Sequence, residues 1–360
     1  MQTNQIIFLP AAVKASNLIQ GARNLMDRAG VKDAEDVLLL CEYSLEQEVI
    51  NAIALAAHEK KAVLTTVMCK DLLPGGREEP PEPVAEAIKS SDVLIDAFSH
   101  PLDHTRIAQE ALFDWGVRYV LSPGLTASIL ESEAARWPVG VFYEISRRLT
   151  AKIRSHKSCR ITDLKGTDVT ASIDPSLVWG ECGPLEYPGD LGLFPEGTVI
   201  IQPGETGDGV IYFDGYHTWG NTRVPIKFTI RKGWVTRIEG GKEAKELQRY
   251  IEGVENARYF DEISFGNNPK FQIERELGKG FSPKTLLHAG VVHFGIGESK
   301  MDGGRYYSES HLDGWLFKPT IYLDDEVVVM NGRLKLLEAP EVIEAVRSWG
   351  DPKELLSEGR

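Results

Sequence analysis

The sequence predicts a two-domain α/β protein, with an N-terminal parallel α/β domain over residues 1–150 and a β-rich, metal-binding domain over residues 151–360. At 360 residues, the chain is longer than one hydrophobic core usually serves. In the first half, continuous apolar runs alternate with helical patterns, which is typical of a parallel sheet covered on both faces. In the second half, short alternating runs separated by glycine-containing turns indicate antiparallel strands.

The elements of the first half follow one another as helix and strand. Helices are predicted over 11–29, 45–59, 84–89, 105–115 and 127–136, and buried strands over 36–41, 62–68, 92–98 and 118–121. The proline-rich segment 71–83 predicts a surface loop. Because no glycine-rich phosphate-binding motif is present here, we expect neither a dinucleotide nor a nucleoside triphosphate. His100 follows the third strand, where open α/β sheets place ligands, and is a candidate substrate-binding residue.

The second half begins with a helix predicted over 142–158, which leads into a hairpin formed by 159–164 and 169–173. Further strands are predicted over 198–202, 209–213, 226–230, 234–239 and 320–330, and a short helix over 243–251. We expect Asp324, Asp325 and Glu326 to form the polar turn of the last hairpin and not a metal site.

The segment 291–315 carries the best metal-ligand candidates of the chain. His311 and Asp313 are separated by one residue, so on an extended strand both side chains point to the same face. His293 lies upstream in a second strand-like run. Two such strands side by side would bring two imidazoles and a carboxylate to one point, as in mononuclear sites with open coordination positions. Neighbouring glycines permit a close approach of the backbone.

Composition restricts the partners that we expect. The net charge of −13 argues against nucleic acid or an anionic membrane as a partner. No apolar run approaches the roughly 20 residues that a membrane span needs. The first residues show no signal-peptide pattern, so we expect a cytoplasmic location. The four cysteines contain no C-x-x-C pair, which indicates reduced thiols.

Several segments resemble two related metalloenzyme families, the thermophilic metallo-aminopeptidases of aminopeptidase T type and the iron-dependent 2,5-dihydroxypyridine dioxygenases. These segments are FPEGTVIIQPGETGDGVIYFDG, RKGWVTRIEGGKEAKEL, DEISFGNNP, VVHFGIG, SHLDG and PTIYLDDEVVVMNGRL. The resemblance is strong over about 195–332 and weaker before it. It implies an N-terminal α/β domain, a C-terminal β-rich domain that holds the metal, and a homodimer.

The resemblance to the aminopeptidases implies four metal ligands. Glu262 in DEISFGNNP matches the second glutamate of that family, and His293 matches its first histidine. His311 and Asp313 match the final ligand pair. If Glu262 is not a ligand, its natural role is that of general base toward a metal-bound water.

The chain also departs from both families. The first glutamate of the aminopeptidases corresponds to Thr198, which cannot bridge two cations, although Glu205 is an alternative carboxylate. A single ion is therefore the economical expectation. The catalytic tyrosine of the aminopeptidases corresponds to Lys300, and Tyr306 nearby is a candidate substrate-binding residue. The third iron ligand of the dioxygenases, a histidine, would fall within 262–265, where this chain has none.

Three functions remain open at the level of the sequence. We favour a metal-dependent hydrolase acting on a small amide or a peptide N-terminus, with Zn, Co or Mn and with Glu262 as base. The alternative is a mononuclear Fe(II) dioxygenase that opens a hydroxylated pyridine or aromatic ring, with Trp315 among the aromatic residues suited to a flat substrate. The third is a family member that binds a metal or small ligand without catalysis.

Overall fold

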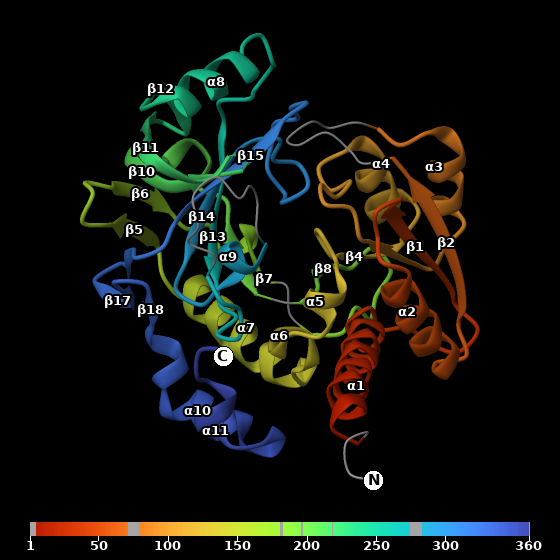
Figure 1. Cartoon of the computed structure of the whole chain (residues 1–360). Helices are drawn as coiled ribbons and strands as arrows, with labels where there is room; N and C mark the ends of the chain where they lie inside the picture. The colour runs from red at the N-terminus through yellow and green to blue at the C-terminus, as the bar shows by residue number, and fades with distance from the viewer. Residues whose placement is uncertain are drawn as a thin grey trace. The chain divides into compact units, whose positions relative to one another are not determined.

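The computed structural model describes residues 5–70, 79–180, 183–195, 197–217, 219–273 and 283–359. The chain forms two compact units (Figure 1). The first is built from residues up to 141 together with 183–195, and the second from 142–180 and from 197 onward. The first unit contains a parallel sheet and the second a large antiparallel sheet, so the expected fold class is confirmed.

The first unit is a five-stranded parallel sheet with helices packed on it. Its strand order is β2 (Val63–Cys69), β1 (Asp36–Glu42), β3 (Val93–Asp96), β4 (Arg118–Leu121) and β8 (Leu191–Leu193). Its helices are α1 (Gln5–Arg28), α2 (Gln47–Glu59), α3 (Glu82–Lys89), α4 (Arg106–Gln109), α5 (Ala127–Leu130) and α6 (Glu133–Arg136). A π-helical turn, Glu110–Asp114, continues α4, and the helix predicted over 127–136 is two short helices.

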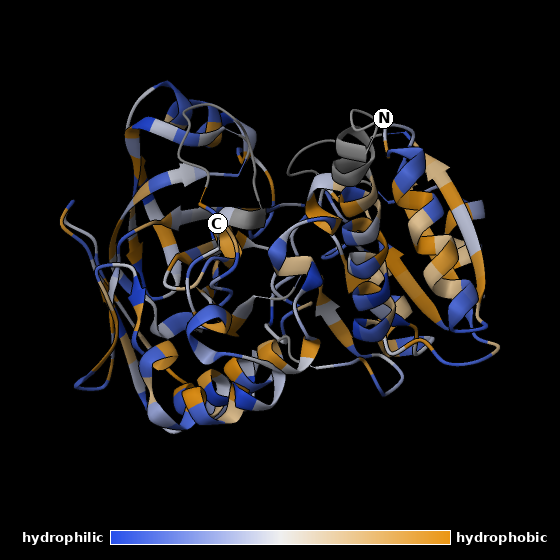
Figure 2. Ribbon diagram, turned by 60° about the horizontal axis from the view of Figure 1, so that its bottom comes forward, coloured by the Kyte–Doolittle hydropathy of each residue, from blue (hydrophilic) through white to orange (hydrophobic). Residues whose placement is uncertain are grey.

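The central strands of this sheet are buried on both faces. Val37 and Leu39 of β1 belong to the core under α1 and α2, whereas Leu38 and Leu40, which alternate with them, are equally buried on the other face. This is why these strands read as continuous apolar runs. Figure 2 shows hydrophobic residues along strands of this unit, while its helices carry both hydrophobic and hydrophilic residues.

The two units do not divide at a single point of the chain, unlike the predicted boundary at residue 150. Helix α7 (Val139–Arg154) lies mostly in the second unit. The segment 183–195 returns to the first unit because β8 pairs in parallel with β4. Arg28 supports this strand: its buried guanidinium donates from Nε to the carbonyl of Leu193 at 3.1 Å.

The second unit is built on an antiparallel sheet. The strand order is β18 (Arg333–Leu334), β17 (Glu326–Met330), β16 (Thr320–Leu323), β5 (Ser158–Thr162), β6 (Asp168–Ser172), β10 (Asp208–Tyr216), β15 (His311–Leu316), β14 (Val292–Gly297), β13 (Phe260–Gly266), β9 (Thr198–Ile201) and β7 (Val178–Gly180). β11 (Gly220–Arg231) pairs with β10 and with β12 (Trp234–Glu239). Besides α7, its helices are α8 (Lys242–Tyr250), α9 (Pro283–Leu287), α10 (Pro340–Val346) and α11 (Pro352–Leu355).

Strands β13, β14 and β15 are buried at nearly every position. Phe294 of β14 packs edge-to-face on Phe213 and stacks on Phe260. Because side chains alternate along a strand, this aromatic packing lies on the face opposite His293 and Gly295. One face of the three strands is therefore a rigid hydrophobic support, and the other carries the polar groups described below.

Several elements differ from the sequence prediction. β13 was not predicted as a strand, and neither were β7, β8, α10 or α11. The predicted turn at Asp324 and Asp325 is confirmed as the connection between β16 and β17. Among the residues described, no helix combines the length and the apolar character that crossing a membrane requires.

Candidate metal centre

Three neighbouring strands bring the four predicted ligands together. Glu262 lies on β13, His293 on β14, and His311 and Asp313 on β15. Nε2 of His293 is 3.1 Å from Oε1 of Glu262, and Nε2 of His311 is 3.1 Å from Oδ1 of Asp313. The ligand atoms of Glu262, His293 and Asp313 lie within 4.8 Å of one another, a separation that one metal ion can span.

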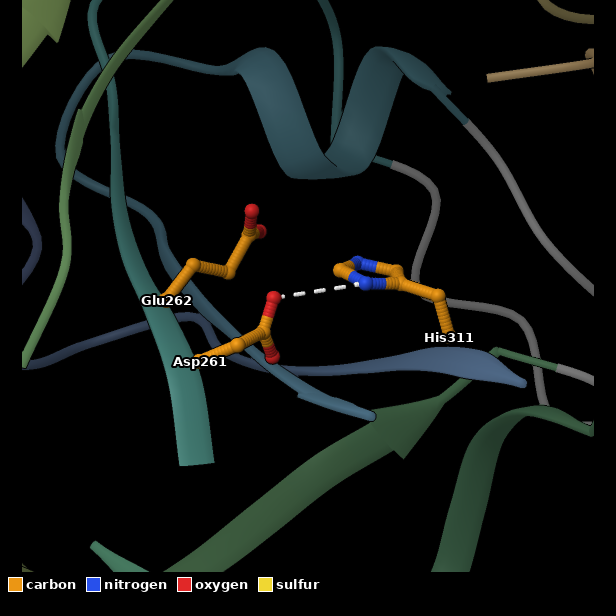
Figure 3. A group of neighbouring side chains, drawn as sticks. All are labelled: Asp261, Glu262 and His311. Atoms are coloured by element: carbon orange, nitrogen blue, oxygen red, sulfur yellow. Dashed lines mark ion pairs between the residues drawn. The ribbon is translucent and has the colours of Figure 1, made fainter. Parts of the chain in front are cut away.

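A β-bulge in β13 shapes the site. Phe260 pairs with Ile296 and Glu262 with Gly295, so Asp261 is the extra residue on its strand. In a regular strand, Asp261 and Glu262 would point to opposite faces. The bulge instead leaves both carboxylates near the ring of His311, as Figure 3 shows. Consequently, Asp261, Glu262 and His311 form a second group with ligand atoms within 4.8 Å.

Gly295 provides the space that the site occupies. It lies between Glu262 and Asp313 in the strand register. A Cβ atom at this position would stand 2.6 Å from Cγ of Glu262 and 2.9 Å from Cε1 of His311. Such distances are far below van der Waals contact, so any side chain here would displace the ligands.

Three residues contact the ligands of β15 on the side away from the other ligands. Nδ1 of His311 lies 3.0 Å from the carbonyl oxygen of Glu298 and 3.3 Å from Oδ2 of Asp261. His217, at the end of β10, donates its backbone N–H to the carbonyl of Asp313 at 2.7 Å. Its Nδ1 is 3.6 Å from Oδ2 of the same residue. Both ligands of β15 therefore have a second layer of polar contacts.

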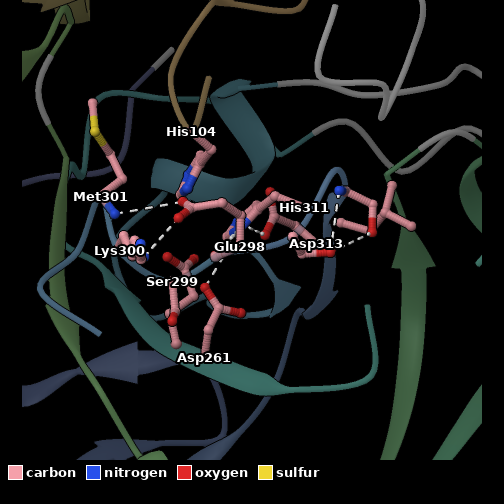
Figure 4. A network of polar contacts seen from close by, with 12 residues as sticks. His104, Asp261, Glu298, Ser299, Lys300, Met301, His311 and Asp313 are labelled. Carbon is pink, nitrogen blue, oxygen red and sulfur yellow. Dashed lines mark hydrogen bonds and ion pairs between the residues drawn. The ribbon is translucent and has the colours of Figure 1, made fainter. Parts of the chain in front are cut away.

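The loop after β14 adds more buried acidic groups. The carboxylate of Glu298 accepts the backbone N–H of Lys300 at 2.7 Å and lies 3.4 Å from that of Met301, which holds the turn beside the site (Figure 4). Asp302 follows in the same turn and is 6% exposed. Five carboxyl groups thus lie in the same cluster as the imidazoles of His217, His293 and His311: those of Asp261, Glu262, Glu298, Asp302 and Asp313.

The charges in this cluster shift one another's ionisation. Burial and the nearby carboxylates raise the pKa of Asp261 well above its usual value, although the charge of His311 opposes this. Burial and Glu262 likewise raise the pKa of Asp302. Burial would lower the pKa of His311, but Asp261 and Asp313 outweigh it and raise that pKa. Burial would raise the pKa of Asp313, but His311 and His217 outweigh it and hold that pKa low. A cation among these carboxyl groups would offset their mutual repulsion and favour their ionised forms.

The other predicted site residues lie in different settings. Trp315 is 1% exposed and donates Nε1–H to Asn221 at 3.0 Å, so it packs in the core, and this placement does not support contact with a substrate. Tyr306 is partly exposed and packs edge-to-face on Trp234 and Tyr259. His100 belongs to the first unit, in the loop after β3, and is partly buried. Substrate binding by Tyr306 and His100 stays a prediction.

The two alternatives considered for the missing carboxylate can also be placed. Thr198 is buried, and its hydroxyl forms a short hydrogen bond with the hydroxyl of Ser264 on β13. Glu205 lies in an exposed turn and belongs to neither ligand group of the described residues. Thr198 therefore supports β13 by hydrogen bonding, and the structure gives Glu205 no position at the metal centre.

Sequence reasoning missed Asp261, His217, Glu298 and Asp302. Asp261 precedes Glu262 in DEISFGNNP, but strict alternation predicts the wrong face for it, and nothing in the segment signals the bulge. His217 approaches Asp313 only because β10 pairs with β15. That pairing is a long-range contact without a local sequence pattern. The acidic residues at 298 and 302, close to VVHFGIG, were the only available hint.

Comparison with known proteins identifies related chains. The family model of NicX, 2,5-dihydroxypyridine 5,6-dioxygenase, matches residues 17–336. A 2,5-dihydroxypyridine 5,6-dioxygenase of Pseudomonas putida is 23% identical over 359 residues, covering 89% of this chain and 96% of that protein. The solved structure of 2,5-dihydroxypyridine dioxygenase from P. putida KT2440 superposes with a TM-score of 0.73 at 21% identity, over 91% of this chain and 99% of that one. Wild-type AmpT of Thermus thermophilus gives 0.65 at 16% identity, over 89% and 99%. These matches agree with both relatives expected from the sequence.

Proposed function

The chain belongs to the 2,5-dihydroxypyridine 5,6-dioxygenase family, and we propose that it is an Fe(II)-dependent dioxygenase that opens a hydroxylated pyridine or related aromatic ring. The observation that carries the proposal is the convergence of two imidazoles and two carboxylates on neighbouring strands of a chain from this family. The family match favours this function over the hydrolase that we favoured from the sequence.

The residues present fit a divalent ion. Imidazole and carboxylate are the ligand types that non-haem iron sites use. Glu262, His293, His311 and Asp313 would hold the ion, and Gly295 leaves the room that it needs. Bound there, Fe(II) would pass electrons from the ring to dioxygen, so that the ring is oxidised as dioxygen is reduced. During ring opening, a ring carbon–carbon bond breaks, and both atoms of dioxygen enter the product as dioxygen is reduced.

The side chains of the chain itself would orient the substrate and control protons. A hydroxylated ring must lose a proton to bind as an anion, and a Glu262 carboxylate oxygen that does not bind the ion would accept it. His293 and Glu262 contact each other at 3.1 Å, so a proton accepted by one can be shared with the other. Both are at least nine-tenths buried, which restricts the access of water to the site.

A hydrolase of aminopeptidase type remains the second candidate. The observation in its favour is Glu262 itself, a carboxylate at the position where the dioxygenase resemblance leads us to expect a histidine. The fold of AmpT, which matches over 89% of the chain, is compatible with either chemistry. In this alternative, Glu262 would take a proton from an attacking water.

Oxygen uptake distinguishes the two functions. Protein loaded with Fe(II) without oxygen is mixed with aerated 2,5-dihydroxypyridine, and then with other dihydroxypyridines and catechol. We expect consumption of one dioxygen for each ring lost, measured with an oxygen electrode and by ultraviolet absorbance. Oxygen-independent cleavage of amino-acid amides, with no uptake on any ring, would contradict the proposal and favour the hydrolase.

Substitution of Glu262 tests its role in the same assay. Glu262→Gln removes the negative charge and the proton acceptor but keeps the shape, so we expect turnover to fall about 10²–10⁴-fold. Glu341→Gln, an exposed position on α10, is the matched control and should retain wild-type turnover. Equal activity of the two variants would exclude Glu262 from the chemistry.

A further inference from the structure

We propose that Asp261 is a positioning residue for the metal centre, which packs against the Nδ1 side of the His311 ring so that Nε2 of that ring faces the ion. The proposal rests on the metal centre of the proposed function but not on the reaction that occurs there. Asp261 belongs to none of the ligand positions expected from the sequence. Its role follows from its contact with His311.

The protonation of the His311 ring follows from its neighbours. Nδ1 lies 3.0 Å from the backbone carbonyl oxygen of Glu298, and a carbonyl oxygen can only accept a hydrogen bond. Nδ1 must therefore carry the proton. Oδ2 of Asp261 lies 3.3 Å from the same nitrogen, on the Nδ1 side of the ring (Figure 3). Nε2 is then the nitrogen left to bind an ion.

This assignment decides between the two possible ligand groups. Nε2 of His311 faces Oδ1 of Asp313 at 3.1 Å, which is the side of Glu262 and His293. Asp261 lies instead against Nδ1. A cation coordinated by Asp261 and by Nδ1 of His311 would have to displace the proton on Nδ1, which is hydrogen-bonded to the carbonyl oxygen of Glu298. We therefore assign the ion to Glu262, His293 and Asp313, with Nε2 of His311 as the fourth ligand. Asp261 contacts the opposite side of the His311 ring and does not bind the ion.

Because Asp261 is buried, its carboxyl group cannot turn to solvent instead of contacting His311. It is 0% exposed, and among the described residues no donor forms a regular hydrogen bond with either of its carboxylate oxygens. A buried carboxyl group without a hydrogen-bond partner is costly, and the ring of His311 is the polar group against which Asp261 packs. The bulge in β13 places Asp261 on the same side of the strand as Glu262, where it can contact His311. A carboxylate behind a metal-binding histidine fixes the ring and increases its basicity.

Nitrogen-15 spectroscopy of the wild-type protein tests the proton position directly. The protein is labelled with [15N]histidine and loaded with Zn²⁺, a diamagnetic probe that needs no turnover. We expect the His311 ring to carry its proton on Nδ1, with Nε2 unprotonated. A proton on Nε2 would overturn the proposal even if every variant failed to fold. Absence of oxygen uptake would overturn the dioxygenase function and leave this result unaffected.

The Asp261→Asn variant tests the effect on the ion. It keeps the size of the side chain but removes its charge, so we expect Zn²⁺ affinity, measured by chelator competition, to fall about 10–100-fold at one ion per chain. Asp302→Asn is the matched control, since it alters another buried carboxyl group of the cluster, whose pKa is raised by burial and then by Glu262. Its effect should be smaller than that of Asp261→Asn. An unchanged affinity in Asp261→Asn, equal losses in both variants, or two ions in the wild type and one in Asp261→Asn would each overturn the proposal.

Discussion

Among single residues, Gly295 has the clearest influence on the metal centre. The space above its Cα is enclosed by Cγ of Glu262 and Cε1 of His311, and both would lie under 3 Å from a Cβ atom. The ligands can converge only because this central position of the sheet carries no side chain. Glycine is thus a structural requirement of the site and not a sign of flexibility.

We expect Gly295→Ala to abolish metal binding while the protein still folds. The added methyl group costs about 1–3 kcal/mol of stability, as overpacking of a buried position usually does. Ile296→Val, at the next residue on the opposite face, should cost about 0.5–1.5 kcal/mol but leave Zn²⁺ affinity unchanged. Calorimetric titration of both variants measures the difference. Wild-type affinity in Gly295→Ala would show that the ion binds elsewhere.

Between elements, the connection after β3 depends on a buried carboxylate. Asp96 at the end of β3 accepts hydrogen bonds from the backbone N–H of Phe98 at 3.1 Å and of Leu102 at 2.7 Å. It also accepts one from the hydroxyl of Tyr119 on β4 at 2.6 Å. These bonds join two strands to the loop that contains His100. Burial nevertheless raises the pKa of Asp96 to about 7, and nearby Asp103 adds to this.

This pKa predicts how stability depends on pH. Because the folded state raises the pKa of Asp96 from its ordinary value, its contribution is present in full below about pH 4 and is lost as pH rises through about 7. We expect this part of the unfolding free energy to decrease by about 2–4 kcal/mol across that window. Asp96→Asn should remove the decrease. Urea titrations of both proteins from pH 4 to 8 measure it, and parallel profiles would contradict the assignment.

The bulge of β13 shows what the sequence can and cannot predict about an element. The spacing of His311 and Asp313 correctly predicts that both side chains share one face, because that depends only on strand periodicity. The position of Asp261 breaks this periodicity by one inserted residue, which depends on the pairing with β14. Local patterns therefore predict the ligands on β15, whereas long-range pairing determines the residues behind them.

Across the whole molecule, the same distinction applies to the fold. Alternating strands and helices predict the parallel sheet, since its strands are apolar throughout. The return of β8 to that sheet could not be predicted, because Leu191–Leu193 is a short run and its partner β4 lies far earlier in the chain. The resemblance to the aminopeptidase family predicted Glu262 as a ligand. The register between β13 and β14 explains why Glu262 lies close to His293.

Binding of an ion should stabilise the folded chain. At a free concentration of 100 times Kd, a bound ion contributes about 2.7 kcal/mol, which corresponds to a rise in Tm of about 5–10 °C. Chelation should reverse this rise, because the buried carboxylates around His311 then repel one another. Differential scanning calorimetry before and after chelation measures the change. An unchanged Tm would indicate that no ion occupies the site.

Metal stoichiometry tests the central claim that Glu262, His293, His311 and Asp313 hold a single divalent ion. Elemental mass spectrometry is applied to the wild type and to His293→Ala after both are loaded with Fe(II) without oxygen and freed of excess metal. We predict one iron per chain in the wild type and less than about one tenth of that in the variant. Two ions per wild-type chain, none, or an undiminished ion in His293→Ala would contradict the account.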